Sequence, residues 1–281
     1  MVTSVRSFVA PGALLVAAAL VAGCGSVPDD PARDAAPSPD SPAPPTDGPP
    51  TLGSKERPAE NCDELLTALG PHSGVYWVKH PDGRSPAFQV YCEQEINRGG
   101  WAMVENSVRK DDGTTNAFWG FGYGDRLSQK GVAAADDNYY QGSLYLIGRD
   151  YMDIIVDLQD KQALAAVMKA TGIDPGTMRF TDPELVIGNR DVFANQFASG
   201  WSAFDFDGDV FAPKNCATEF GNVAQHYAQC WAYNLGADAE APVLDGGVGP
   251  HVNTDTLVAL GLAGDGTVYS QVKRIARFTR W

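Results

Sequence analysis

Hydrophobic and polar residues alternate in short runs along most of the chain after residue 58. Such runs, rich in aromatic and β-branched residues and bounded by Gly, Pro, Asp and Asn, are typical of half-buried β-strands. The pattern therefore predicts a central antiparallel sheet. Its strands are expected within residues 73–79, 87–95, 99–106, 143–148, 152–159 and 267–278.

Helical periodicity is rare and is clearest in two stretches. Residues 62–69 (CDELLTAL) follow Asn61, and residues 160–172 carry Ala, Leu, Val and Met at three- and four-residue spacing before Gly172. We therefore expect an α+β domain with few short helices and long loops. The glycine-rich interval 245–266 is long for a connection, and long ordered loops usually serve a function or cover a site.

The pattern at the start of the chain is different. Arg6 precedes an apolar run over residues 8–23, which is too short and too rich in small residues for a membrane span and is typical of a secretion signal. The run ends in Val-Ala-Gly-Cys, which resembles a bacterial lipobox, where the cysteine becomes the lipidated first residue. We therefore predict a signal peptide over 1–23 and lipidation of Cys24. Ordinary cleavage beside a free Cys24 is the alternative.

Residues 24–58 lack the large apolar side chains that a core requires. They are rich in Pro, Ser, Ala and Asp and hold more than half of the chain's prolines. We predict that this lipidated segment is a disordered, semi-stiff tether and that residues 59–281 form one domain. The protein is then expected outside the cytoplasm, anchored to a membrane at the cell surface.

Four cysteines remain after Cys24, an even number in a chain that is bound for an oxidising compartment. They predict two disulfides among Cys62, Cys92, Cys216 and Cys230. Three pairings are possible from sequence. The local pairing Cys62–Cys92 and Cys216–Cys230 closes short loops and is the simplest.

The formal net charge of the chain is −14. An acidic surface repels phosphate backbones and anionic lipid headgroups. We therefore expect no nucleic-acid partner and membrane contact only through the lipid anchor, whereas a cation such as calcium would be attracted.

Several of these segments together resemble the fibrinogen C-terminal-like domain, across nearly all of residues 59–281. The resemblance implies that fold, with a central antiparallel sheet and a loop-rich subdomain that binds calcium and ligand. Arg98 and Ala102 depart from the family pattern, and residues 161–200 and 238–266 align poorly. The matching pieces are Cys62, 73–76 (SGVY), 81–83 (PDG), 90–92 (VYC), 99–101 (GGW), 122–125 (GYGD), 153–160 (DIIVDLQD), the aspartate–cysteine stretch 204–216 and 269–278 (YSQVKRIARF).

The stretch 204–216 (FDFDGDVFAPKNC) places Asp205, Asp207 and Asp209 at alternate positions. Calcium takes six to eight oxygen ligands, and alternating aspartates in a turn can direct several carboxylates into one concavity. The spacing is not that of an EF-hand, because Gly208 lies between the second and third acidic positions and Cys216 stands where the closing Glu would be.

The resemblance implies which atoms of this loop would hold the ion, Ca2+. It assigns the side chains of Asp207 and Asp209, the main-chain carbonyl of Phe211, and Asp205 nearby. One extra residue precedes Cys216, so the second carbonyl would come from Ala212 or Pro213. The alternative is a solvated acidic turn that is held by hydrogen bonds from the aspartates to nearby backbone amides.

The resemblance also implies a ligand pocket beside a Cys216–Cys230 clamp, with aromatic residues around it. In the family the peptide bond before the second cysteine tends to be cis, which here corresponds to Gln229–Cys230. The alternative is that the aromatic residues only pack the clamp. The positions that match the pocket, or lie next to it, are His226, Tyr227, Gln229, Trp231 and Tyr233.

The sequence carries no arrangement of residues that is typical of an enzyme. The four histidines have no metal-ligand spacing, and the nucleophile and phosphate-binding motifs are missing from the sequence. We therefore expect a calcium-stabilised recognition module that binds glycan, such as acetylated sugars, or another extracellular ligand. The alternative is a structural or adhesion protein that acts by protein–protein contact through its sheet surface, without a sugar pocket.

Overall fold

The computed structural model describes residues 49–110, 114–230, 232–236 and 249–281. The chain divides into two units, Met1–Gly48 and Pro49–Trp281, and the described residues belong to the second. The predicted signal peptide and Cys24 therefore lie outside the described residues. The folded unit begins before the predicted boundary at 59, because Gly53 accepts a hydrogen bond from the amide of Trp77 at 2.8 Å.

Short strands make up most of the regular structure. They are β1 (Gly74–Val78), β2 (Phe88–Glu93), β3 (Trp101–Val108), β4 (Gln129–Gly131), β5 (Tyr139–Gln141), β6 (Asp150–Val156), β7 (Gln162–Lys169), β8 (Gly172–Ile173), β9 (Phe180–Thr181), β10 (Glu184–Ile187), β11 (Trp201–Ser202), β12 (Gln225–His226), β13 (Tyr233–Asn234), β14 (His251–Asn253), β15 (Tyr269–Gln271) and β16 (Arg274–Arg280).

The helices are short. They are α1 (Cys62–Leu69), α2 (Thr114–Trp119), α3 (Asn195–Ser199), α4 (Cys216–Glu219) and α5 (Thr254–Ala259), with the 3₁₀ turns η1 (Ile96–Arg98), η2 (Tyr123–Asp125) and η3 (Gly142–Leu146) and the π-helical turn η4 (Arg190–Ala194). Among the described residues, no helix combines the length and the apolar character that a membrane crossing requires.

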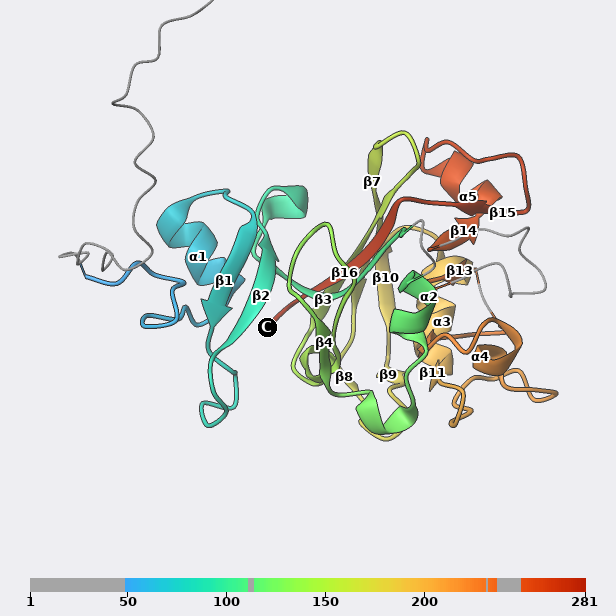
Figure 1. The fold of residues 1–281 in the computed structure, drawn as a ribbon, viewed down its shortest axis with the longest axis horizontal. Coiled ribbons are helices and arrows are strands. Elements are labelled where there is room, and N and C mark those ends of the chain that lie inside the picture. Colours follow the sequence, from blue (N-terminus) through green and yellow to red (C-terminus); the bar gives the residue numbers. More distant parts are fainter. Residues whose placement is uncertain (1–48, 111–113, 231, 237–248) are drawn as a thin grey trace, which may run out of the picture. The chain divides into compact units, whose positions relative to one another are not determined.

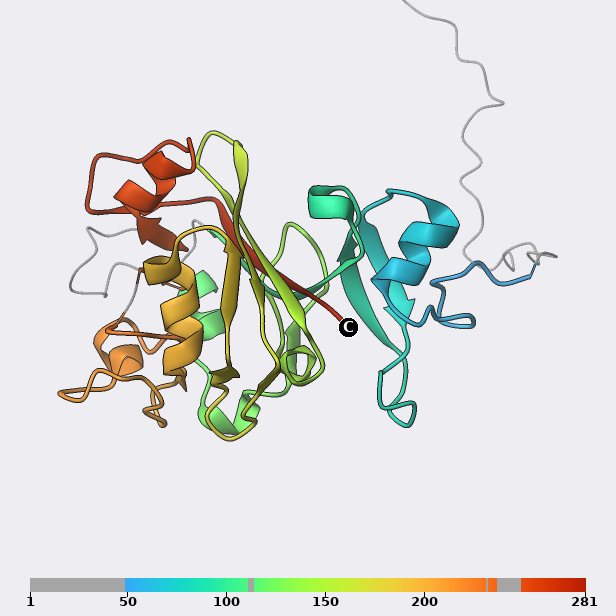
Figure 2. The same ribbon diagram turned by 180° about the vertical axis from the view of Figure 1, so that it is seen from behind.

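The main sheet is antiparallel throughout and has the order β1-β2-β3-β16-β6-β7-β10, with β5 also paired to β3 and β4 to β5. Strand β16, at the end of the chain, is therefore central (Figure 1). Helix α1 lies with β1 and β2 at one end of the sheet, whereas α3 lies near β10 at the other (Figure 2). The α+β fold class is confirmed.

Two element predictions were wrong. Residues 160–172, predicted to be helical, contain strand β7, which pairs with β6 over its whole length and with β10 on its other side. A short apolar run such as 163–168 satisfies either structure, and pairing on both edges selects the strand. Residues 143–148, predicted to be a strand, overlap the 3₁₀ turn η3. The other predicted strands and helix 62–69 are confirmed.

Both disulfides have the predicted local pairing. Cys62–Cys92 joins α1 to β2 with a Cα–Cα distance of 5.6 Å, and Cys216–Cys230 spans 4.9 Å. Helix α1 begins at a capped end, because the Asn61 side chain accepts a hydrogen bond from the amide of Glu64 at 2.9 Å.

The glycine pair before β3 allows two chain segments to approach closely. A Cβ atom on Gly99 would lie 2.3 Å from the carbonyl oxygen of Gln94, and one on Gly100 would lie 1.8 Å from Asp63 Oδ1. Trp101 follows, fully buried, with the Arg280 guanidinium 3.8 Å above its ring. These residues are structural.

The core holds a charged cluster on three neighbouring strands. Arg277 of β16 lies opposite Glu105 of β3 and Asp153 of β6 in the sheet register. Its guanidinium donates to Glu105 Oε1 at 2.6 Å, to Asp153 Oδ1 at 2.8 Å and to the Tyr145 and Tyr233 hydroxyls at 2.9 Å. All five side chains are buried, and the donors and acceptors satisfy one another.

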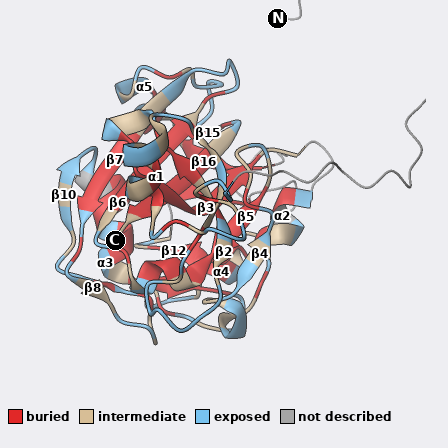
Figure 3. Ribbon diagram, turned by 90° about the vertical axis from the view of Figure 1, so that its left-hand side faces the viewer, coloured by how far each residue is buried: buried red, intermediate tan, exposed pale blue. Residues whose placement is uncertain are grey.

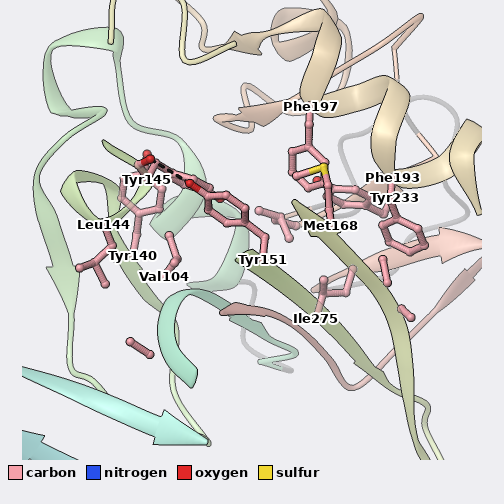
Figure 4. Packing of buried hydrophobic residues seen from close by; sticks show 14 of the residues in the cluster. Val104, Tyr140, Leu144, Tyr145, Tyr151, Met168, Phe193, Phe197, Tyr233 and Ile275 are labelled. Atoms are coloured by element: carbon pink, nitrogen blue, oxygen red, sulfur yellow. Dashed lines mark hydrogen bonds between the residues drawn. The ribbon is translucent and has the colours of Figure 1, made fainter. Parts of the chain in front are cut away.

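Aromatic residues surround this cluster. The central strands are largely buried (Figure 3). The Tyr151 hydroxyl donates to the Tyr145 carbonyl at 3.0 Å, while Phe193 stacks on Tyr233 with ring centroids 6.2 Å apart (Figure 4). The core therefore links the sheet to the segments that carry the predicted calcium loop and pocket.

Candidate calcium loop and ligand pocket

The aspartate loop follows β11 and has a closed base. Ala203 and Phe206 exchange two backbone hydrogen bonds of 2.9 and 3.1 Å. Gly208 approaches β11 so closely that a Cβ atom would lie 2.3 Å from the Trp201 carbonyl oxygen. The sequence therefore needs glycine between the second and third aspartates to fold the loop back onto β11.

Asp209 organises the loop through its carboxylate. Oδ1 accepts from the Phe211 amide at 2.8 Å, and Oδ2 accepts from the Ser202 hydroxyl at 3.1 Å and the Cys216 amide at 3.0 Å. The bond to Phe211 is the aspartate–backbone turn of the alternative interpretation. Asp209 therefore ties the loop to the first cysteine of the clamp.

The other two aspartates, Asp205 and Asp207, are exposed and interact with different neighbours. Asp205 Oδ1 accepts from the Tyr123 amide at 2.7 Å, which connects the loop to η2. Partial burial and the adjacent Asp209 carboxylate raise the pKa of Asp207. The structure thus brings Asp207 and Asp209 together, and it directs Asp205 toward η2.

Side chains alone do not form a cation site at the aspartate loop, so main-chain carbonyl oxygens would have to complete it. Among the described residues, no group of three His, Cys, Asp or Glu side chains could hold a metal ion. The Phe211 carbonyl accepts one hydrogen bond, from the Lys214 amide at 3.1 Å, and keeps a second lone pair. The groups that would hold calcium are therefore the Asp207 and Asp209 carboxylates, the Phe211 carbonyl, and the carbonyl of Ala212 or Pro213 further along the loop.

Two polar residues that the sequence interpretation missed fix this arrangement. Asn215 caps α4 by accepting from the Ala217 amide at 2.8 Å, and its Nδ2 donates to the Ala203 carbonyl at 2.8 Å. The Ser202 hydroxyl accepts from the amides of Gly208 and Asp209, both at 3.0 Å. Asn215 precedes the helical turn as capping residues do, whereas nothing in the sequence distinguishes Ser202.

The Cys216–Cys230 clamp is formed, but its backbone differs from the expected one. All peptide bonds between described residues are trans, so Gln229–Cys230 is not the cis bond that the resemblance implied. Cys230 instead has a φ of 65°, and Ala228 donates to the Cys230 carbonyl at 3.1 Å in a tight turn. The turn therefore depends on the left-handed backbone conformation of Cys230.

A pocket of about 420 Å³ opens beside the clamp, and we call it the clamp pocket. Helix α3 forms one wall, the aspartate loop contributes Val210, and the clamp supplies the rest. None of the described lining residues carries a charge. They are Asn195, Gln196, Ser199, Val210, Ala228, Gln229, Cys230 and Ala232.

Of the residues predicted to bind ligand, Gln229 lies in this lining and is exposed. His226, Tyr227 and Tyr233 are at most 1% exposed and support the region from the core side. Trp231 lies outside the described residues. The α3 residues were missed because they fall in the segment 161–200, where no motif marks them.

Two buried residues that the sequence suggested for ligand binding, His226 and Tyr227, have pKa values that keep them neutral. Burial, and then the Arg277 charge, lowers the pKa of His226 to about 3, and its Nε2–H donates to the Met178 carbonyl at 2.8 Å. Burial raises the pKa of Tyr227 well above its usual value, and the hydroxyl donates to the Val223 carbonyl at 2.8 Å. Neither residue is poised to transfer protons near neutral pH.

Gln196 is another member of the lining with unusual surroundings. The residue is 1% exposed, and among the described residues neither its amide nitrogen nor its amide oxygen has a hydrogen-bond partner. A buried amide without partners is costly, typically by about 1–3 kcal/mol. Water or a ligand in the clamp pocket would relieve that cost.

Comparisons with known proteins place these features in context. No protein-family model matches the chain. The chain is 28% identical to the fibrinogen alpha chain of Mus musculus over 213 residues, and 27% identical to that of Homo sapiens over 206 residues; each match covers 65% of this chain. It spans about a quarter of the length of these relatives, 25% and 22% respectively.

A solved structure of a fibrinogen-like domain has a similar fold. The fibrinogen-like globe domain of human ANGPTL6 superposes with a TM-score of 0.56 and 22% identity. The match covers 79% of this chain and 95% of that domain. The chain therefore has the fibrinogen-like fold that its sequence motifs predict.

Proposed function

We propose that this protein is a recognition module that binds an uncharged extracellular ligand, a glycan, in the clamp pocket. The observation that carries the proposal is the pocket itself. Its volume of about 420 Å³ falls in the range of small-ligand sites, and its walls combine apolar residues with carboxamides and a hydroxyl. The fibrinogen-like fold supports binding rather than catalysis.

The chemistry of the lining favours a sugar over a charged peptide terminus. An ammonium or carboxylate would need a charge of opposite sign, and the described lining residues offer none. Carboxamides and hydroxyls instead match the hydroxyl and acylamino groups of a neutral saccharide, including an acetylated one. The amide of Gln196 offers both donors and an acceptor at the back of such a site.

The test is a glycan array probed with the full chain in calcium, with two variants. Gln229→Ala removes an exposed carboxamide from the pocket and should weaken sugar binding about tenfold, the effect of about one to two hydrogen bonds. Gln159→Ala, an exposed glutamine of the β6–β7 turn, is the matched control and should bind as wild type does. Trp231→Ala extends the comparison to the aromatic position beside the clamp.

The competing function is adhesion through protein–protein contact. An array with no bound sugar, together with cell adhesion that Gln229→Ala leaves intact, would replace the glycan proposal with this one. Equal sugar binding by wild type and Gln229→Ala would instead show that the sugar lies elsewhere on the surface.

We further propose that calcium stabilises the aspartate loop, held by the carboxylates of Asp207 and Asp209, by the Phe211 carbonyl and by the carbonyl of Ala212 or Pro213. Two adjacent carboxylates repel each other, and this repulsion contributes to the raised pKa of Asp207. A cation between them would remove the repulsion. We expect a Kd of about 10⁻⁴ to 10⁻³ M, as in other extracellular modules.

Thermal unfolding checks the calcium proposal. Calcium tenfold to hundredfold above Kd should stabilise the full chain by about 1.4 to 2.7 kcal/mol relative to chelator. Asp207→Asn should abolish this response, whereas Asp255→Asn, at an exposed carboxylate of α5, should retain it. Melting temperatures that do not differ between calcium and chelator would leave only the hydrogen-bonded acidic turn.

Membrane attachment is part of the same proposal. The two disulfides fit an oxidising compartment outside the cytoplasm. Lipidation of Cys24 falls outside the described residues and stays a prediction, which the mass of the mature amino terminus would check.

A further inference from the structure

A second pocket lies away from the clamp, between strands β7 and β10, the start of η4 and helix α5. Its volume is about 570 Å³, and it shares no lining residue with the clamp pocket. We call it the helix–strand pocket. Leu164 of β7, Ile187 of β10, Phe193 of η4 and Leu260 after α5 form its large apolar walls.

The polar side chains of this pocket, Asn189 and Thr256, already make hydrogen bonds. The Asn189 side chain accepts from the Val192 amide at 3.3 Å, and the Thr256 amide and hydroxyl both lie within 3.5 Å of Asn253 Oδ1 in the cap of α5. None of the described lining residues is charged. The pocket therefore offers a contact surface for hydrocarbon and little for a charged ligand.

Exposed apolar residues continue from the lining along the same elements. Ile187 itself is 43% exposed, and its neighbour Val186 and the α5 residue Val258 are 51% and 62% exposed. Large apolar side chains that remain exposed around a concave site mark a place where apolar surface is covered on binding. Phe193 is buried and stacks on Tyr233 (Figure 4). The Tyr233 hydroxyl in turn accepts a hydrogen bond from Arg277 at 2.9 Å.

The edge strand beside the pocket is a poor partner for another strand. β10 is the last strand of the sheet and has four residues, and its register with β7 shifts between Leu185 and Ile187. Pro183 precedes it and has no amide to donate. Bulges, short length and proline are the features that keep sheet edges from pairing, so a bound strand does not explain the apolar surface.

We propose that the helix–strand pocket is a binding site for a compact, uncharged, largely hydrocarbon molecule. The volume suits a small molecule, the walls are apolar on the β7, β10 and α5 sides, and the lining offers no opposite charge for an ionic ligand. This site is independent of the sugar site proposed above, so either can exist without the other.

The test titrates the full chain, in detergent-free buffer, with N-phenyl-1-naphthylamine, an uncharged apolar probe whose fluorescence rises on burial. Two variants alter the lining. Ala259→Trp fills the mouth of the pocket from α5, and Ile187→Asp places a charge in its wall. Each has a matched control at an exposed valine away from this pocket: Val132→Trp, after β4, and Val75→Asp, in the edge strand β1 at the other end of the sheet.

Wild type should bind one probe per chain with saturation. Ala259→Trp and Ile187→Asp should weaken binding at least tenfold, while the two controls and Gln229→Ala in the clamp pocket should bind as wild type does. Melting temperatures within a few degrees of wild type would show that the variants are folded. If the lining variants lose their fold, the milder Ile187→Thr, which keeps a β-branched side chain and adds a hydroxyl, should still weaken probe binding more than Val75→Thr does.

Three results would overturn the proposal. The first is the lack of saturable binding by wild type, and the second is equal binding by the lining variants and their controls. The third is a wild-type dimer, seen by sedimentation, that Ile187→Asp dissociates. In that case a second copy of the chain covers the pocket.

Discussion

His226 lies among the rings of Tyr145, Phe180 and Phe197, whose centroids are 5.3 to 5.4 Å away. The sequence interpretation placed this residue in the ligand pocket, because it precedes the clamp tyrosine. Burial instead makes it a neutral core residue that donates to the Met178 carbonyl. A single sequence does not distinguish these roles, since both use the same side chain.

This environment predicts how stability depends on pH. The folded pKa of His226 is about 3, below its usual 6.5, so the unfolded chain binds a proton that the folded chain does not. The stabilising contribution is complete above pH 6.5 and is lost progressively as pH falls toward 3. Between pH 7.5 and 5.5 the free energy of unfolding should fall by about 1.4 kcal/mol on account of this residue.

Urea unfolding at the two pH values measures the loss. His226→Gln, which can still donate to the Met178 carbonyl, should remove about 1.4 kcal/mol of the pH-dependent change. His72→Gln, at an exposed histidine, should leave it as in wild type. A pH dependence that is the same in all three proteins would mean that His226 is accessible to protons in the folded state.

Among elements, those with a clear local pattern were predicted, whereas β7, whose local pattern is ambiguous, was not. Helix α1 carries its own cap at Asn61 and forms where expected. Strand β7 has a helix-like spacing of apolar residues, but hydrogen bonds to β6 and β10 decide its structure. Those partners lie at other positions in the chain, so a local pattern cannot reveal them.

The turn before β3 gives a prediction at this scale. Gly99 has φ of 66° and ψ of −167°, a conformation almost restricted to glycine, and a Cβ atom would contact the Gln94 backbone. Gly99→Ala should lower the free energy of unfolding by about 3 kcal/mol or more, as strain and steric overlap combine.

Gly83 is the matched control, because it has φ of 62° and an added Cβ atom would have no neighbour within 4 Å. Gly83→Ala should cost only about 1–2 kcal/mol, the strain of the left-handed backbone. Guanidinium unfolding of both variants makes the comparison, and equal losses would refute the role of close backbone approach at Gly99.

At the scale of the whole molecule, the Arg277 cluster joins three strands to the segment after the clamp. Burial raises the pKa of both Glu105 and Asp153, and the Arg277 charge opposes this effect. Replacing the arginine alone would leave two buried carboxylates without a cation. Losses of this kind are typically about 3–5 kcal/mol.

We therefore expect Arg277→Met to be destabilised by about that amount in guanidinium unfolding at pH 7.5. Adding Glu105→Gln and Asp153→Asn should restore most of the stability, because the remaining groups are neutral and can still form hydrogen bonds. A triple variant as unstable as Arg277→Met would show that packing of the arginine over Phe197, at 4.0 Å, matters more than its charge.

The sequence by itself determined the fold class, the helix at residues 62–69 and most strands of the sheet, and it made the local cysteine pairing the simplest of three, which the structure confirms. These features depend on residues that are close in sequence, or on motifs that recur in order along the chain. It also located the aspartate loop, because the three carboxylates are only two residues apart.

Only the tertiary structure decided which atoms face one another. It brought Asp207 beside Asp209, turned Asp205 toward Tyr123, and built the clamp pocket from α3 together with Val210 and the clamp. It also buried the histidine and tyrosines that the sequence suggested for ligand binding. The physical reason is that exposure and long-range hydrogen bonding depend on the packing of segments distant in sequence, which local periodicity does not record.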